Sequence, residues 1–146
     1  MRVGIVFPGQ GSQYNKMGLD FLNVSEESVT FCRAVEKHIS IGINELLSDV
    51  EKNDELSQLR IVVAEILIYL AFKSEILKSE FKNNIEIDFA AGHSLGEFSA
   101  LYVSGILTLS ELLNLVLFRN KIIKERQFSE KTTMIAITNS DISSVI

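Results

Sequence analysis

Residues 90–101 read AAGHSLGEFSAL, which places Ser94 between two glycines on a G-x-S-x-G spacing. The preceding residues, IEIDFAA at 85–91, alternate and then become wholly apolar, as expected of a buried strand. The residues that follow have a helical pattern that ends at the next glycine. A sharp strand-to-helix turn lifts its central side chain clear of the sheet, and Gly92 and Gly96 supply the small residues that such a turn needs. The stretch therefore predicts that Ser94 is a nucleophile.

A nucleophilic serine of this kind needs backbone N–H donors for the oxyanion that forms during acyl transfer. The predicted helix after Ser94 presents unpaired N–H groups at its N-terminus, so the N–H of Leu95 is one candidate. A second is the N–H of Gln10 in the glycine-rich stretch FPGQGSQ (7–13), which follows an apolar strand predicted at 3–7. Taken alone, that stretch fits a simple tight turn better. It lacks the G-x-G-x-x-G spacing of a dinucleotide site.

The two histidines are not predicted to activate the serine. His93 is adjacent to Ser94, and neighbouring residues on such a turn point in different directions, so His93 is interpreted as a packing or hydrogen-bonding residue. His38 falls near the end of a predicted amphipathic helix and is expected to face solvent.

Arg119 lies on a helix predicted over 108–126 and shares the face of its apolar residues. That face is formed by Leu112, Leu115, Val116, Ile122 and Ile123. An inward guanidinium must find an anion, because leaving it unpaired costs on the order of several kcal/mol. The partner is either an internal Asp or Glu or the carboxylate of a substrate, held through two parallel hydrogen bonds. Periodicity alone slightly favours the internal acid.

The rest of the chain alternates predicted strands with predicted helices. Helices are predicted from Ser25, over INELL (43–47), and over 58–79 as one long helix or two in series. Thr108 and Glu111 match a capping box at the start of the helix that carries Arg119, and TTMIAIT (132–138) is a further predicted strand. This alternation indicates an α/β architecture with a mostly parallel sheet.

Composition excludes several classes of protein. The chain has 146 residues, 47% of them hydrophobic, which fits one ordinary domain with a core. Its formal net charge is −5 and no run of Lys or Arg forms a stripe, which argues against nucleic-acid binding. Cys32 is the only cysteine, so an intrachain disulfide is excluded. No signal peptide is evident, and the longest apolar stretch (61–72) is too short to span a membrane. A soluble, cytoplasmic protein is expected.

Three stretches occur in order along the chain: VFPGQGSQYNKMG (6–18), AGHSLGEFSALYVSG (91–105) and LVLFRNKIIKE (115–125). Together they resemble the malonyl-CoA:acyl-carrier-protein transacylase family and the related acyltransferase domains of polyketide synthases. The resemblance runs the full 146 residues. It implies an α/β fold with a hydrolase-like parallel-sheet core, here incomplete, and an inserted ferredoxin-like subdomain. Residues 1–127 would be the N-terminal part of the large subdomain, and 128–146 the beginning of the small one.

The resemblance also implies a ping-pong acyl transfer in fatty-acid or polyketide biosynthesis, with no cofactor and no metal. Ser94 would attack the thioester of malonyl-CoA, and the malonyl group would then pass to the phosphopantetheine thiol of acyl carrier protein. The N–H groups of Gln10 and Leu95 would form the oxyanion hole. Arg119 would hold the malonyl carboxylate, and His93 would have a supporting role. The implied partners are a coenzyme A thioester and acyl carrier protein, with no nucleic acid and no membrane.

The sequence departs from the family pattern in two places. The family's catalytic histidine lies beyond the position of residue 146, and neither His38 nor His93 takes its place. The chain is therefore expected to be an N-terminal fragment with negligible transacylase activity by itself, because a serine without its base is a weak nucleophile. Many members also carry a Gln-Pro pair before the helix that lines the pocket, whereas VVAEIL (62–67) contains no proline, which leaves the acyl preference open.

Two other functions stay open from the sequence. A serine hydrolase such as a thioesterase would use water as the acceptor and would have no need of an inward Arg119. A non-catalytic module that binds coenzyme A thioesters or a carrier protein would account for the missing base, but it would not need Ser94 and Gln10.

Overall fold

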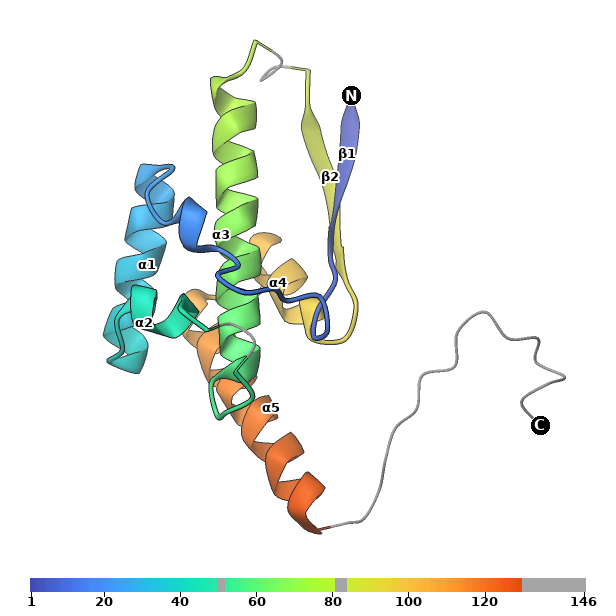
Figure 1. The fold of residues 1–146 in the computed structure, drawn as a ribbon. Helices are drawn as coiled ribbons and strands as arrows, with labels where there is room; N and C mark the ends of the chain where they lie inside the picture. Colours follow the sequence, from blue (N-terminus) through green and yellow to red (C-terminus); the bar gives the residue numbers. More distant parts are fainter. Residues whose placement is uncertain (50–51, 81–83, 130–146) are drawn as a thin grey trace, which may run out of the picture.

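The computed structural model describes residues 1–49, 52–80 and 84–129, which form a two-stranded parallel sheet and a group of helices (Figure 1). Along the chain the elements are β1 (Arg2–Phe7), the short 3-10 helix η1 (Leu19–Phe21), α1 (Glu26–Ile39), α2 (Ile43–Leu47), α3 (Ser57–Lys78), β2 (Glu86–Gly92), α4 (Gly96–Val103) and α5 (Leu109–Ser129). The α/β architecture predicted from the sequence is confirmed, and the pattern at 58–79 forms one helix of 22 residues.

Some predictions fall outside this description. The strand predicted at 132–138 lies outside the described residues, as does the small subdomain predicted at 128–146 beyond the end of α5. None of the described helices is long and apolar enough to cross a membrane.

The sheet brings two distant loops together. Strand β1 pairs in parallel with β2, with Arg2 opposite Glu86 and Phe7 opposite Gly92. Parallel strands need a long crossover, and helices α1 to α3 provide it. Because both strands end at the same edge of the sheet, the loops after Phe7 and Gly92 leave it side by side.

Helix α3 forms the centre of the core. Figure 1 shows it between α1 and α2 on one side and the two strands on the other. Its residues from Ser57 to Leu67 are all buried, including the apolar run from Ile61 to Ala64. A helix that is buried on every side must satisfy any polar side chain it carries inside the protein. The polar residues of α3 therefore become informative about the site.

The start of α5 is fixed by the predicted capping box. The carboxylate of Glu111 accepts a hydrogen bond from the backbone N–H of Thr108 at 2.8 Å, and the Thr108 hydroxyl accepts one from the N–H of Glu111 at 3.3 Å. The box satisfies two N–H groups that the helix leaves unpaired at its end. It thereby sets where α5 begins and which side chains it turns toward α3.

The face that α5 buries differs from the predicted one. Leu112 and Val116 are fully buried as expected, but Leu115 is 42% exposed and Ile122 is 36% exposed. Leu113 and Asn120 are buried instead, because α5 packs against both α3 and α4 along a stripe rotated from the one that periodicity suggested. Arg119 lies at the border between the two stripes and is half-buried.

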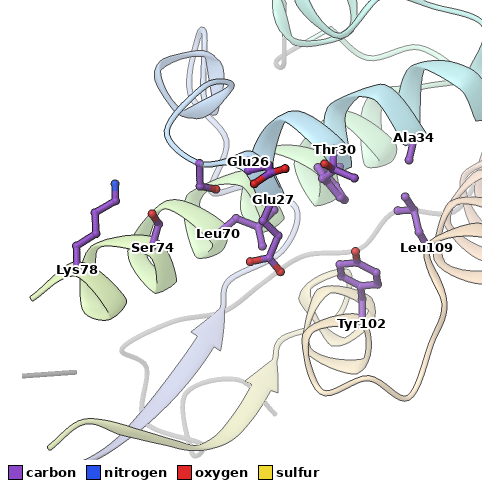
Figure 2. A pocket seen from close by; sticks show the side chains of 11 residues that line it. Glu26, Glu27, Thr30, Ala34, Leu70, Ser74, Lys78, Tyr102 and Leu109 are labelled. Atoms are coloured by element: carbon purple, nitrogen blue, oxygen red, sulfur yellow. The ribbon is translucent and has the colours of Figure 1, made fainter. Parts of the chain in front are cut away.

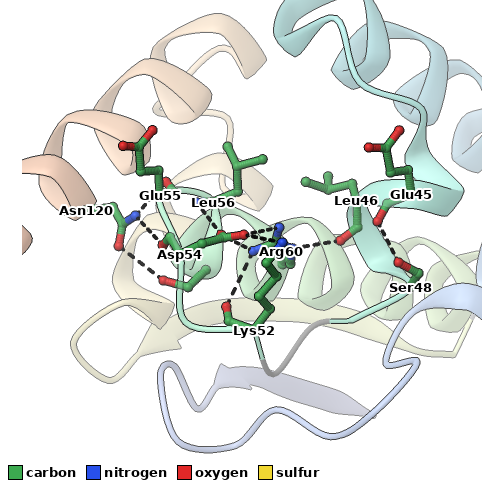
Figure 3. Close-up of polar contacts among 10 residues, drawn as sticks. Glu45, Leu46, Ser48, Lys52, Asp54, Glu55, Leu56, Arg60 and Asn120 are labelled. Atoms are coloured by element: carbon green, nitrogen blue, oxygen red, sulfur yellow. Dashed lines mark hydrogen bonds and ion pairs between the residues drawn. The ribbon is translucent and has the colours of Figure 1, made fainter.

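A polar cluster holds the first turn of α3 in place (Figure 3). The Arg60 guanidinium forms an ion pair with Asp54, and its Nε donates to the carbonyl of Leu46 at 2.9 Å. From α5, Asn120 Nδ2 donates to the carbonyl of Glu55 at 2.6 Å. The Arg60 side chain is only 7% exposed. The cluster therefore joins α2, the loop before α3 and α5 through buried polar groups.

Asp54→Asn is expected to lower the free energy of unfolding by about 2 kcal/mol at pH 7, because it leaves the Arg60 guanidinium without its counter-charge. Arg60 also holds the pKa of Asp54 well below its ordinary value of 3.8. Such a carboxyl stabilises the fold above its unfolded pKa and loses that contribution as the pH falls toward its folded pKa. The difference between variant and wild type is thus expected to shrink below about pH 3.8 in urea unfolding.

Glu125→Gln is the matched control, because the ion pair of Glu125 with Lys121 is exposed and is expected to matter little to stability. The role of the cluster is contradicted when Asp54→Asn unfolds like the wild type at pH 7. It is also contradicted when the stability difference stays constant as the pH is lowered.

Candidate active site

The turn between β2 and α4 has the strand-to-helix geometry predicted for it. Ser94 sits at the turn with φ 53°, in the left-handed region that residues with a Cβ rarely adopt. Its side chain is exposed, whereas Leu95, the next residue, is fully buried. The turn thus presents the Ser94 hydroxyl to solvent and anchors itself in the core through Leu95.

Close backbone packing explains the two glycines that flank the serine. A Cβ on Gly92 would overlap the backbone of Gly96, and a Cβ on Gly96 would overlap the carbonyl of Phe7. The elbow therefore folds back on itself and presses on the end of β1. Only glycine leaves room for both contacts.

The loop after β1 lies against this elbow. The N–H of His93 donates to the carbonyl of Phe7 at 3.0 Å. A Cβ built on Gly9 would lie 3.3 Å from the backbone nitrogen of Leu95, so Gln10 follows directly on a residue that touches the elbow. Within the described part of the chain, the N–H groups of Gln10 and Leu95 donate to no other group.

Arg119 reaches the serine from α5. Its Nη2 donates to Ser94 Oγ at 3.2 Å, and its Nη1 donates to Gln58 Oε1 at 2.6 Å. The guanidinium carbon also lies 6.0 Å from the centre of the Phe98 ring. No Asp or Glu among the described residues binds Arg119. The internal acid that periodicity favoured is therefore wrong, and the cation points at the candidate nucleophile instead.

Gln58 was missed in the sequence analysis. It lies in the first turn of α3, is 1% exposed, and accepts from Arg119 while its Nε2 donates to Gln10 Oε1 at 3.4 Å. It thus connects the loop after β1 to the arginine. The available signal was a glutamine at the start of the long apolar helix predicted over 58–79. The Gln-Pro pair was noted as missing at 62–67, whereas Gln58 stands earlier and is followed by leucine.

Glu65 was not among the site residues predicted from the sequence. It is 4% exposed, its Oε1 accepts from the N–H of Gly9 at 3.0 Å, and its Oε2 accepts from the hydroxyl of Ser99 at 2.5 Å. Burial raises the pKa of this carboxyl above its ordinary value. A single carboxylate therefore touches both the loop after β1 and helix α4.

Neither histidine contacts the serine hydroxyl. The His93 side chain is exposed and forms no hydrogen bond within the described part of the chain. His38 is exposed near the end of α1, as predicted, with its Nε2 3.0 Å from Asn114 Oδ1. The described residues also contain no cluster of His, Cys, Asp or Glu suited to a metal ion. They place a cation, but no proton acceptor, at Ser94.

A hollow of ≈680 Å³ lies apart from this site, between helices (Figure 2). It is lined by residues of α1, α3 and α4 that include Glu27 and Tyr102, and neither Ser94 nor Arg119 belongs to it. Glu27 is already paired with Lys73 at 2.8 Å. Glu26 and Lys78 also line the hollow, and Lys78 is paired with Glu75 at 3.0 Å, so the hollow carries charged side chains but none of the predicted site residues.

Similarity to known proteins covers nearly the whole chain. A family model described as the acyl transferase domain matches residues 5–145. The malonyl CoA-acyl carrier protein transacylase of Bacillus subtilis is 30% identical over 140 residues, which are 93% of this chain and 33% of that protein. An erythronolide synthase of Saccharopolyspora erythraea is 32% identical over 127 residues, covering 84% of this chain and 4% of that protein.

A solved structure is similar to this chain in its fold. The malonyl CoA-acyl carrier protein transacylase of Clostridium perfringens has a TM-score of 0.69 and 29% identity, over 86% of this chain and 38% of that one. The chain thus spans about a third of the length of these transacylases. On the match of residues 5–145, it belongs to the acyl transferase domain family.

Proposed function

We propose that this chain is the N-terminal part of a cytoplasmic enzyme that transfers a malonyl group from coenzyme A to acyl carrier protein. The observation that carries the proposal is the 3.2 Å contact between Arg119 Nη2 and Ser94 Oγ. It puts a cation within reach of the far carboxylate of a short diacid whose carbonyl carbon is attached at Ser94. The names of the relatives in Bacillus subtilis and Clostridium perfringens agree with this substrate.

The proposed chemistry has two steps. Ser94 Oγ attacks the thioester carbonyl of malonyl-CoA, the C–S bond breaks, and the coenzyme A thiol leaves with the proton that the serine gives up. The phosphopantetheine thiol of acyl carrier protein then attacks the malonyl-serine ester, the ester C–O bond breaks, and the thiol proton passes to the serine oxygen, which restores the hydroxyl. In both steps negative charge develops on the carbonyl oxygen, where the N–H groups of Gln10 and Leu95 would stabilise it.

Arg119 would select the acyl group. A guanidinium binds a carboxylate through two parallel hydrogen bonds, which an acetyl group has no means to accept. Gln58 Oε1 accepts from Nη1 of the same guanidinium at 2.6 Å, so the cation is oriented before substrate arrives. His93, which is exposed beside the serine, would support substrate from the solvent side.

The proton transfer needs a base that the described residues do not place at Ser94. Arg119 donates to the hydroxyl and has no lone pair with which to take its proton. We propose that the base is a histidine in the part of the enzyme that this chain does not cover. In the relatives, that part makes up about two thirds of the whole length. Residues 1–146 alone would then acylate slowly and transfer very little.

A thioesterase is the second candidate, with water in place of the carrier thiol. The orientation of Arg119 toward Ser94 favours the transacylase, because a hydrolase of simple acyl groups has no use for a cation there. The acceptor would be a carrier protein of fatty-acid or of polyketide synthesis, and the relatives include both a malonyl CoA-acyl carrier protein transacylase and a polyketide synthase.

Ser94→Ala is expected to abolish covalent labelling by malonyl-CoA. Residues 1–146 incubated with excess malonyl-CoA should slowly gain the mass of one malonyl group, located on Ser94 by peptide mass spectrometry. Ser104→Ala, which changes an exposed serine at the end of α4, is the control and should label like the wild type. A malonyl adduct on Ser94→Ala, or no adduct on the wild type, overturns the proposed nucleophile.

Arg119→Ala is expected to lower the preference for malonyl-CoA over acetyl-CoA by about 10- to 100-fold, since it removes charge-assisted hydrogen bonds to the carboxylate. The measurement is a competition of the two thioesters for Ser94, read as the ratio of the two adduct masses. Lys121→Ala removes a nearby exposed cation of α5 and should leave the ratio unchanged. An unchanged ratio in Arg119→Ala would favour the thioesterase.

A further inference from the structure

The two proposed oxyanion donors belong to different segments of the chain. Gln10 follows β1, and Leu95 follows β2 at the start of α4. An oxyanion hole works only when both donors meet the same oxygen at hydrogen-bond distance, so their separation must be fixed. The strand pairing fixes the segments at the edge of the sheet, but Gly9 already lies beyond the end of β1.

Glu65 connects the loop after β1 to helix α4. Its Oε1 accepts from the N–H of Gly9, the residue before Gln10, at 3.0 Å. Its Oε2 accepts at 2.5 Å from Ser99, one helical turn after Leu95 on α4. Both hydrogen bonds are made by one carboxylate on the central helix α3, so both segments are held against the same helix.

We propose that Glu65 is a positioning residue that sets the spacing between the N–H groups of Gln10 and Leu95. It touches neither Ser94 nor the substrate, and it acts through Gly9 and Ser99. The inference rests on the proposed function for its effect on acylation, while its effect on the loop after β1 is independent of that function.

The surroundings of Glu65 support a role beyond packing. The side chain borders a hollow that is otherwise lined by apolar residues such as Met17, Ile68 and Tyr69. An apolar side chain would fill this position without the desolvation that a buried carboxylate suffers. It would, however, leave the buried N–H of Gly9 without an acceptor, and the loop would shift to find another. The carboxylate therefore holds the loop where an apolar residue would release it.

The test compares Glu65→Leu, which has no acceptor, with Glu65→Gln, whose amide oxygen accepts from Gly9 and whose amide nitrogen donates to Ser99. Glu65→Leu is expected to slow malonyl labelling of Ser94 by about tenfold or more, because small misplacements of oxyanion donors are costly in rate. Glu65→Gln should stay within about threefold of wild type. Val35→Ala, a fully buried change in α1, is the control for lost stability and should leave the labelling rate near wild type.

The second readout is the backbone amide resonance of Gly9 in 15N-labelled protein. It should move strongly in Glu65→Leu, move less in Glu65→Gln, and stay in place in Val35→Ala. An unmoved Gly9 resonance in Glu65→Leu overturns the proposal, as does equal slowing by Glu65→Leu and Val35→Ala. When the wild type forms no adduct, the proposed function fails, and the Gly9 resonance still decides whether Glu65 positions the loop.

Discussion

The left-handed backbone at Ser94 is the constraint on which the site depends. A residue with a Cβ at φ 53° costs roughly 1–3 kcal/mol, which the packing around the turn must offset. That packing comes from Phe7, whose carbonyl accepts from His93 at 3.0 Å and presses against Gly96. The serine is therefore presented correctly only while β1 and β2 pair in the observed register.

Arg119 depends on a second, separate set of contacts. The next residue, Asn120, is 2% exposed, and it binds the loop before α3 through Glu55. Arg119 binds Gln58 in the first turn of the same helix. Two consecutive residues of α5 thus contact the start of α3. Asn120 holds the loop before this helix, and Arg119 binds Gln58 at the site. The Arg60 cluster therefore stabilises the same helix turn that carries Gln58, the hydrogen-bond partner of Arg119.

Local chemistry made part of the site predictable, and long-range contacts decided the rest. The elbow at Ser94 and the cap at Thr108 follow from short spacings, because turns and helix ends are set by residues close in sequence. The partner of Arg119 was predicted wrongly, since periodicity indicates a face but not what lies opposite. Gln58 and Glu65 were not predicted, because their hydrogen-bond partners are distant in sequence. The partners of Gln58 lie 48 or more residues away, and those of Glu65 lie 34 or more residues away.

The contacts at Ser94 would serve only part of the proposed acyl transfer. A guanidinium that donates to the hydroxyl occupies one of its lone pairs and stabilises negative charge, but it has no acceptor for the proton. Under the proposed mechanism, the N–H donors and the cation would bind a thioester and stabilise its oxyanion, whereas deprotonation would come from a group that approaches Ser94 from another side. Because the serine is exposed at the turn, that side is open to such a group. In the proposed mechanism, the described residues would thus supply substrate binding and charge stabilisation, but not the proton acceptor.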